Sequence, residues 1–465
     1  MKKLHPLAVA TLTLAAGSAF AAGEVTNVIF CLGDGMGPTT VTASRIYKYG
    51  EAGQLAMESL RRTARIKTYS NDAQTTDSAP SMAAYMTGVK MNNEVISMTA
   101  DTKAYNGVKP YINGADTTCP TSGNGSAVPT LLERAKAAGK SVGAVTTTRI
   151  THATPAATFS HICHRDGENN IAAQVVPGSG QFNAALGSGV DVLLGGGAKF
   201  FLPATNPIGK RTDGKDLTAL LQTAGYTYVT TGSALKNVNA SSTSKLVGLF
   251  NADHMNYELD RVKKNIDEPS LADMTEKAIQ MLQKNGKGYF LMVEGGRIDH
   301  ALHGTNAKRA LEDTIAFDEA IRRALAMVDA KNTLIVVTAD HDHTMTFNGY
   351  SHKGNPILGK TTDIKPTTVQ GKPVLAKAAD GLPYTTLVFG NGGGPRKATR
   401  DDVTSVDTAA DDYLQEVSIP LGAPGSETHG GGDVMLFSTG AGSAPFKGTM
   451  VNTKVFGLVK SALGL

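Results

Sequence analysis

Short apolar runs recur along the chain and alternate with stretches of helical spacing. Runs rich in β-branched residues predict six strands, at residues 25–32, 141–147, 190–194, 289–293, 333–339 and 434–437. Apolar residues at helical spacing predict helices over residues 128–138, 271–284 and 306–330. Strands that are apolar throughout are typical of a parallel sheet that is buried on both faces. The pattern predicts an α/β fold, a three-layer sandwich with a mostly parallel central sheet flanked by helices.

The segment from about residue 344 to residue 426 departs from this alternation. It is rich in glycine, proline and polar residues, and it indicates an irregular, crown-like insertion. Length alone would suggest about three domains. However, the candidate functional residues run from Asp34 to His429 and would have to converge from both ends of the chain. We therefore expect a single domain over residues 23–465 with an insertion at about 344–426.

The first residues have the pattern of an export signal. Lys2 and Lys3 precede an apolar stretch over residues 7–14, and Ala-Phe-Ala at residues 19–21 has the small-x-small pattern of a cleavage site. Residues 1–22 are therefore expected to be a signal peptide. No later segment is apolar for long enough to span a bilayer. The protein is expected to be periplasmic or secreted.

Charge and cysteine content narrow the possible partners and redox state. The formal net charge of +4 is too small to argue for nucleic-acid or membrane binding. Three cysteines in an oxidising compartment allow one disulfide. Because Cys31 lies inside an apolar strand, Cys119 and Cys163 are the expected pair.

Potential metal ligands lie where the apolar runs stop. Six of them follow an apolar run or its immediate continuation: Asp34, Glu294, Asp299, His303, Asp340 and His341. The seventh, His429, precedes an apolar run. Strands of an open α/β sheet build their site at the carboxyl edge, where such residues would meet. A polynuclear metal centre is the first hypothesis. Any one of these residues alone would more often be an ordinary turn or core residue.

Ser78 is the candidate nucleophile. It lies between Asp77 and a small-residue stretch that is expected to form a helix through Tyr85 and Met86. A helix N-terminus presents free N–H groups and the positive end of a dipole to an anion, which suits attack on phosphate. The alternative is that Ser78 is only a helix N-cap, which is the more frequent role of such a serine taken alone.

Six ordered motifs together are far more specific than any one of them. They are Asp34-Gly-Met-Gly37, Asp77-Ser-Ala79, THATPAATFSH with Arg165 beyond it, EGGRIDHALHG, TADHDH and ETHGGGDV. Their order and spacing, from Asp34 to His429, resemble those of the alkaline phosphatases. The resemblance implies metal-dependent hydrolysis of phosphate monoesters through a covalent phosphoserine at Ser78, with broad specificity and an alkaline optimum. It also implies a homodimer.

The resemblance assigns ligands to two Zn²⁺ ions and one Mg²⁺ ion. The first zinc is expected at Asp299, His303 and His429, the second at Asp34, Asp340 and His341, and magnesium at Asp34, Thr154 and Glu294. Two zincs can hold the attacking and the leaving oxygen of an in-line displacement. An all-oxygen set suits a hard ion such as magnesium.

The resemblance also implies that Arg165 clamps the phosphate. A planar guanidinium fits two phosphate oxygens better than a lysine does. Arg149 precedes the THATPA motif instead of following it, and it is not expected to take this role.

The remaining histidines fall into two classes. His152 and His300 occupy positions where some family members have Asp and Lys, so the third site is open to zinc or another transition ion. His343 is expected to support a ligand and not to be one. The others have no such context and are expected to be structural: His161, His164, His254 and His352.

The sequence departs from the family pattern after His429. The usual HGGED is HGGGD here, with Gly431 and Gly432 before Asp433. The missing Glu places a supporting contact to His429 in doubt, but not the ligand itself.

Two other kinds of function would fit part of this pattern. A phosphodiesterase or a sulfatase of the same superfamily would share the scaffold, but diesterases commonly use Thr as nucleophile and sulfatases use a modified Cys or Ser in another motif. Ser78, Arg165 and the magnesium set favour monoesters. The second alternative is a non-catalytic metal- or phosphate-binding protein, against which an intact Ser78 argues.

Overall fold

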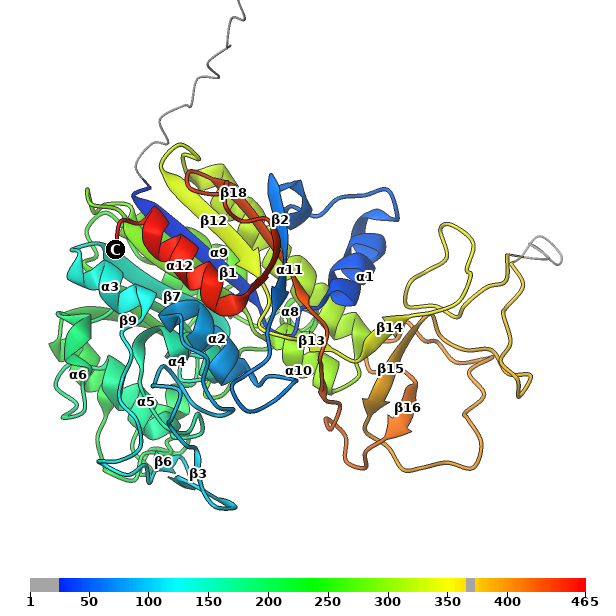
Figure 1. The fold of residues 1–465 in the computed structure, drawn as a ribbon, viewed down its shortest axis with the longest axis horizontal. Coiled ribbons are helices and arrows are strands. Elements are labelled where there is room, and N and C mark those ends of the chain that lie inside the picture. The colour runs from blue at the N-terminus through cyan, green and yellow to red at the C-terminus, as the bar shows by residue number, and fades with distance from the viewer. Residues whose placement is uncertain (1–24, 365–372) are drawn as a thin grey trace, which may run out of the picture.

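The computed structural model describes residues 25–364 and 373–465. The predicted signal peptide, residues 1–22, lies outside the described residues. The central feature is a ten-stranded sheet (Figure 1). From one edge to the other its strands are β19 (Gly448–Val451), β2 (Arg62–Lys67), β18 (Val434–Gly440), β12 (Thr333–Thr338), β1 (Asn27–Gly33), β11 (Tyr289–Gly295), β7 (Ser141–Arg149), β8 (Val192–Gly196), β10 (Lys245–Leu249) and β9 (Tyr226–Val229). Of these ten strands only β18 runs antiparallel to its neighbours.

Helices cover both faces of this sheet (Figure 1). One layer contains α2 (Ser78–Thr87), α3 (Leu131–Ala137), α4 (Ala153–Phe159) and α12 (Asn452–Ala462). The other contains α1 (Pro38–Tyr49), α9 (Leu271–Leu282) and α11 (Ala307–Met327). Shorter helices lie in the connections: α5 (Glu168–Val175), α6 (Leu217–Thr223), α7 (Gly232–Asn237), α8 (Glu258–Lys263) and α10 (Arg297–His303). The predicted three-layer α/β sandwich is confirmed.

The six predicted strands are β1, β7, β8, β11, β12 and β18, with ends that differ by a few residues. The sheet also contains four strands that the apolar pattern did not predict: β2, β9, β10 and β19. In β2, buried residues alternate with exposed charged ones such as Arg65 and Lys67, so no apolar run forms. Both β9 and β19 are short edge strands, which need less apolar surface than a central strand does.

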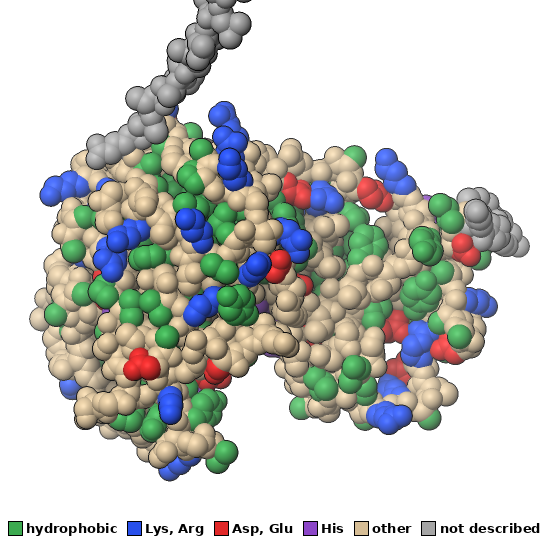
Figure 2. Space-filling view, in the orientation of Figure 1, with side chains coloured by type: hydrophobic (Ala, Val, Ile, Leu, Met, Phe, Trp, Pro, Cys, Tyr) green, Lys and Arg blue, Asp and Glu red, His purple; other side chains and the backbone are tan. Residues whose placement is uncertain are grey.

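A second, smaller sheet lies apart from the main one (Figure 1). It consists of β14 (Met345–Phe347), β15 (Leu387–Gly392) and β16 (Val417–Pro420). We call the described residues between 344 and 426 the lobe; Figure 2 shows the surface hollowed between it and the main body. The lobe lies where the irregular insertion was predicted, and it contains more regular structure than predicted. The division into domains stays a prediction.

The chain enters and leaves the lobe at one place. There β13 (Asp342–His343) pairs antiparallel with β17 (His429–Gly430), which places His343 opposite His429. Two hairpins elsewhere are formed by β3 (Tyr105–Asn106) with β4 (Lys109–Pro110) and by β5 (Ile112–Asn113) with β6 (Asp116–Thr117). No helix within the described ranges is long and apolar enough to cross a membrane.

Strand register brings distant residues to one edge of the sheet. In β1, Leu32 lies opposite Glu294 of β11 on one side and Thr338 of β12 on the other. Asp34 and Asp340 therefore follow at the same carboxyl edge as Glu294. Because β18 is antiparallel, its amino end lies at that edge too, which is why His429 precedes its strand while the other candidates end theirs.

Candidate metal centre and nucleophile

The first ligand group combines helix α10 with the paired strands β13 and β17 that flank the lobe. Asp299 and His303 lie one turn apart on α10, and Asp299 Oδ1 is 3.3 Å from His303 Nε2 and 3.6 Å from His429 Nε2. His343 donates through Nε2 to the same carboxylate oxygen at 2.8 Å. The three residues expected at the first zinc are thus brought together, with His343 beside them.

The second group surrounds Ser78. His341 Nε2 lies 3.3 Å from both Asp34 Oδ1 and Asp340 Oδ2, and all three side chains are completely buried. Asp340 is held by backbone N–H groups, since its Oδ1 accepts from Gly35 and from His341 at 3.0 Å each. The residues expected at the second zinc are therefore also brought together.

The tautomers in these two groups suit a cation. In three of the histidines, Nδ1 faces a backbone carbonyl oxygen and a neutral ring donates to it. The pairs are His303 with Glu427, His341 with Asp342 and His429 with Thr76. Nε2 then carries the lone pair, and in each ring it faces carboxylate oxygens. The Nε2 atoms of His303 and His429 are only 3.1 Å apart. Lone pairs and carboxylates that converge in this way fit a metal ion, and a metal-bound histidine is usually oriented by a carbonyl that accepts from its other nitrogen.

The third group is formed mainly by oxygen ligands. Asp34, Glu294 and His152 can each bring one ligand atom within 4.8 Å of the others. Among the described residues, Asp34 Oδ2, Glu294 Oε1 and Thr154 Oγ1 are buried without a hydrogen-bond partner. Buried polar atoms normally have partners, so these orphaned oxygens point to an ion.

Carboxylate crowding supports the same conclusion. Burial raises the pKa of Asp34 well above its usual value, and the charges of Asp340, Asp299 and Glu294 raise it further. Burial likewise raises the pKa of Glu294 to about 7, against hydrogen bonds from Thr146 and Thr148. So many carboxylates in one buried place need either protons or cations.

Ser78 is not the N-cap of its helix. Asp77 holds the N-cap position of α2 and Ser78 is the first helical residue. Its Oγ lies 3.1 Å from His341 Nε2 and 3.5 Å from Asp34 Oδ1. The N-cap alternative for this serine is therefore wrong, and its hydroxyl is directed at the second ligand group.

Arg165 is held beside this group by acidic and main-chain partners. Its guanidinium forms an ion pair with Asp77, whose other oxygen accepts from the Glu94 N–H at 3.1 Å. The Arg165 N–H donates to the Glu94 carbonyl at 2.8 Å. By contrast, Arg149 pairs with Glu168 and Asp253. The preference for Arg165 over Arg149 as the phosphate clamp stays a prediction.

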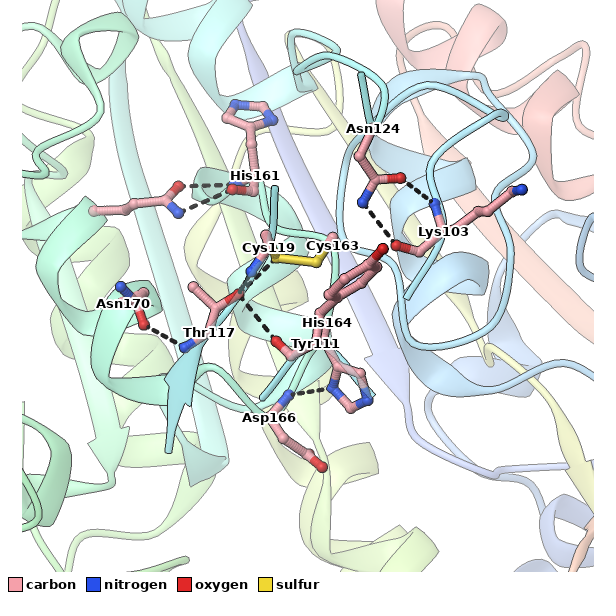
Figure 3. Close-up of a disulfide and its surroundings, with 11 residues drawn as sticks. Lys103, Tyr111, Thr117, Cys119, Asn124, His161, Cys163, His164, Asp166 and Asn170 are labelled. Atoms are coloured by element: carbon pink, nitrogen blue, oxygen red, sulfur yellow. Dashed lines mark hydrogen bonds between the residues drawn. A yellow bond between two sulfur atoms is a disulfide. The ribbon is translucent and has the colours of Figure 1, made fainter. Parts of the chain in front are cut away.

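The predicted disulfide anchors the loop that carries Arg165. Cys119 and Cys163 are bonded, as Figure 3 shows, and Cys163 lies two residues before Arg165. Cys31 is free and buried, as expected. The bond links the loop between α4 and α5 to the segment after the second hairpin.

Sequence reasoning missed Glu427. This carboxylate is buried and accepts from His343 Nδ1 at 2.6 Å, while its carbonyl accepts from His303 Nδ1. Burial would lower the pKa of His343, but the hydrogen bonds that its ring donates to Asp299 and Glu427 raise it to about 10. The only sequence signal was the position of Glu427 two residues before His429. His429 itself is held by the Thr76 carbonyl at 2.8 Å, which provides a supporting contact despite the departure from HGGED.

His254 was also missed. It was expected to be structural without a particular context, but its ring packs against those of His152 and His300, with centroids 5.2 and 4.2 Å away. The other histidines assigned to structural roles have local partners: His161 bonds Glu133, His164 accepts from the Asp166 N–H and His352 bonds Thr362. No spacing rule pointed to His254, because its loop follows β10, far along the chain from the other two.

Comparisons with known proteins agree with this geometry. A family model described as alkaline phosphatase matches residues 25–465. The tissue-nonspecific alkaline phosphatase of Rattus norvegicus is 38% identical over 444 residues, covering 89% of this chain and 79% of that protein. An alkaline phosphatase of Gadus morhua is 37% identical over 443 residues, covering 89% and 86%.

Solved structures are similar as well. The alkaline phosphatase of Thermus thermophilus has a TM-score of 0.70 and 28% identity, with 98% of this chain and 96% of that chain covered. That of the Antarctic bacterium TAB5 has a TM-score of 0.65 at 24% identity, with 95% and 99% covered, and shares the fold. With a family match over the whole described chain and curated relatives near 38% identity, this chain belongs to the alkaline phosphatase family.

Proposed function

We propose that the chain hydrolyses phosphate monoesters with Ser78 as nucleophile and Arg165 as the phosphate clamp. The observation that carries this proposal is the position of Ser78 Oγ, within 3.5 Å of both His341 and Asp34. Ser78 also begins α2, whose free N–H groups and dipole favour an approaching anion. The family membership supports the same reaction.

The proposed ions are two zincs and one magnesium. Asp299, His303 and His429 would hold the first zinc, Asp34, Asp340 and His341 the second, and Asp34, Thr154 and Glu294 the magnesium. When bound, such ions stabilise negative charge on the attacking and leaving oxygens. An imidazole at His152 beside the third group suits a transition ion as an alternative to magnesium.

The chain's own groups account for two balanced steps. The Ser78 oxygen attacks phosphorus, the bond to the alcohol oxygen breaks, and the alcohol leaves with a proton. Water then attacks the phosphoserine, the Oγ–P bond breaks, and Ser78 recovers its hydroxyl as inorganic phosphate leaves. Arg165, held by Asp77, would neutralise two non-bridging oxygens throughout. Because these contacts are with the phosphoryl group, the alcohol is weakly selected, which gives broad specificity.

The test compares three ester classes on matched variants. Purified protein is assayed on a phosphate monoester, a phosphodiester and a sulfate ester, beside Ser78→Ala and the control Ser44→Ala, a buried serine of α1. We expect the monoester to be the best substrate and Ser78→Ala to lose at least about a thousandfold in kcat. Acid-quenched wild type should carry one phosphate on Ser78. Full activity of Ser78→Ala, or a preference for the diester or sulfate, would overturn the proposal.

Two further proposals concern the protein as a whole. The disulfide supports export to an oxidising compartment, the periplasm or the medium. A homodimer is proposed from family membership, and sedimentation velocity tests it. A single species at the monomer mass would contradict the dimer.

A further inference from the structure

Three imidazoles meet beside the phosphate clamp. His152 precedes α4, His254 follows β10 and His300 lies on α10, yet their ring centroids are 4.2 to 5.4 Å apart. We call these three the histidine cluster. His152 is 9% exposed, while His254 and His300 are half-buried, so the cluster opens to solvent on their side.

Arginine N–H groups already face every ring of the cluster. Arg165 Nη2 lies 2.9 Å from His152 Nε2, and Arg297 Nη1 lies 2.9 Å from His300 Nδ1. At His254 both nitrogens face donors of Arg149, the backbone N–H at Nδ1 and the guanidinium at Nε2. Arginine only donates, so these contacts use the lone pair of each ring.

The cluster therefore has more donors than acceptors. A neutral imidazole has one lone pair and one N–H, so three rings supply three acceptors for four arginine donors, and they add three N–H groups of their own. His152 Nδ1 is buried without a partner among the described residues, and so is Arg297 Nε. The missing component is an acceptor.

A cation is a poor occupant of this cluster. A metal needs lone pairs that point inward, and a metal-bound histidine normally donates its other nitrogen to an acceptor. Here arginines face those nitrogens instead.

Arg297 forms no close ion pair, although its charge lowers the pKa of the buried Asp313 against the effect of burial. Its guanidinium lies 3.8 Å from the centroid of the Tyr257 ring and has no ion-pair partner within 4.0 Å in the part of the chain that the structure describes. Arg149, in contrast, is paired with Glu168 and Asp253. An oxyanion at the cluster would offer an acceptor to the unpartnered His152 nitrogen and a counter-charge to Arg297, which contacts His300.

We propose that the histidine cluster and Arg297 bind a second phosphate group on the alcohol part of the substrate, so that bisphosphates are preferred to simple monoesters. This inference rests on the proposed function. Its geometric basis is that His152 touches Arg165, the proposed clamp of the reacting phosphoryl group, at 2.9 Å. The cluster therefore contacts the clamp directly through His152, and the rings of His254 and His300 lie 5.2 and 5.4 Å from that ring.

The experiment compares two substrates of the same length, propane-1,3-diol bisphosphate and 3-hydroxypropyl phosphate. We expect the wild-type enzyme to favour the bisphosphate about tenfold in kcat/KM after correction for its two equivalent phosphates, mainly through KM. Such a factor is the size of one charge-assisted hydrogen bond. Arg297→Gln should reduce the preference to near one, and His254→Gln should reduce it severalfold.

Arg309→Gln is the matched control, because Arg309 also packs on Tyr257 but pairs with Asp260. It should keep the preference. Equal kcat/KM values in the wild type, or a preference that survives Arg297→Gln, would overturn the inference. An additional transition ion that elemental analysis finds in the wild type and not in His254→Gln would show a metal site instead. If neither compound is hydrolysed, the proposed function fails and not merely the second subsite.

Discussion

Glu427 and His343 are joined by a 2.6 Å hydrogen bond between Oε2 and Nδ1, with both side chains completely buried. The same ring donates from Nε2 to Asp299, one of the proposed zinc ligands. The other Glu427 oxygen accepts the Thr344 N–H at 2.8 Å. The carboxylate thus favours the protonated form of this ring and fixes its orientation, and the ring in turn positions a ligand.

Replacing this carboxylate should weaken the first ligand group. In Glu427→Gln the amide retains similar size but loses the charge that helps keep His343 protonated, so Asp299 is less well held. We expect metal affinity or kcat/KM to fall about 10- to 100-fold, the usual cost of losing a partner behind a ligand. Metal titration of the apoenzyme measures the first quantity, and excess zinc should rescue activity partly. Glu416→Gln, in the lobe, is the control; an equal loss there would contradict a specific role.

Replacing Glu294 should remove one metal ion and leave the other two bound. Its carboxylate belongs to the third group, whereas the first and second groups do not use it. For Glu294→Gln we expect elemental analysis to show the loss of about one ion per chain while the two zincs remain. Activity should fall without disappearing. Loss of all three ions, or of none, would refute the separation of the third site from the others.

The disulfide should act on stability and on phosphate binding together. It closes a loop with a sequence separation of 44, which in the chain-entropy model contributes about 4 kcal/mol to stability. It also anchors the loop carrying Arg165, so a Cys119→Ser/Cys163→Ser variant should show a raised KM as well as easier unfolding. Urea titrations and phosphate inhibition constants check the two effects.

Reductant provides the control for the disulfide. It should reproduce both effects in the wild type and change nothing in the double variant. An unaltered KM in the double variant would show that the loop is held by Asp77 and Glu94 alone.

The buried pair of Glu133 and His161 should make stability depend on pH. Burial opposes both charges, yet the hydrogen bond and charge of each partner lower the pKa of Glu133 below 4.5 and raise that of His161 above 6.5. The contribution of Glu133 to the free energy of unfolding is complete above pH 4.5 and is lost as the pH falls through its lowered pKa. The contribution of His161 to the free energy of unfolding is complete below pH 6.5 and is lost as the pH rises through its raised pKa. The pair is thus most stabilising between these limits.

His161→Gln should therefore destabilise the protein more at pH 5.5 than at pH 9. Urea unfolding of the variant and the wild type at both values, with metals at fixed concentration, measures the difference. His352→Gln, a histidine of the lobe bonded to Thr362, should show no such contrast between the two pH values. A loss for His161→Gln that is equal at both would contradict the ion pair.

Local pattern was sufficient for much of the fold. Fully apolar β-branched runs predicted the central strands because a strand covered on both faces must be apolar throughout. They did not predict β2, where Arg65 and Lys67 alternate with buried residues. Helix α10 was not among the predicted helices, although Asp299 and His303 are four positions apart, which places them on one face of it.

The candidate site was predictable where residues end strands or form ordered motifs. Asp34, Glu294 and Asp340 follow this rule because register alone carries them to one edge. Glu427 and His254 do not, since each meets its partners through a loop whose path is set by packing far away in the chain. Nothing local in a sequence encodes such a meeting.

The sequence by itself predicted the layers and the disulfide pair that the structure contains, and it supplied the strand-end ligands and the nucleophile that are proposed. Each of these depends on periodicity, on adjacency to a strand or helix end, or on a motif. Only the tertiary structure decided which atoms face one another. It turned three histidine Nε2 lone pairs toward carboxylates, placed Glu427 behind His343, and gathered His254 with His152 and His300 under arginine donors. These contacts join residues up to hundreds of positions apart, so they arise only when the whole sheet and its loops have packed.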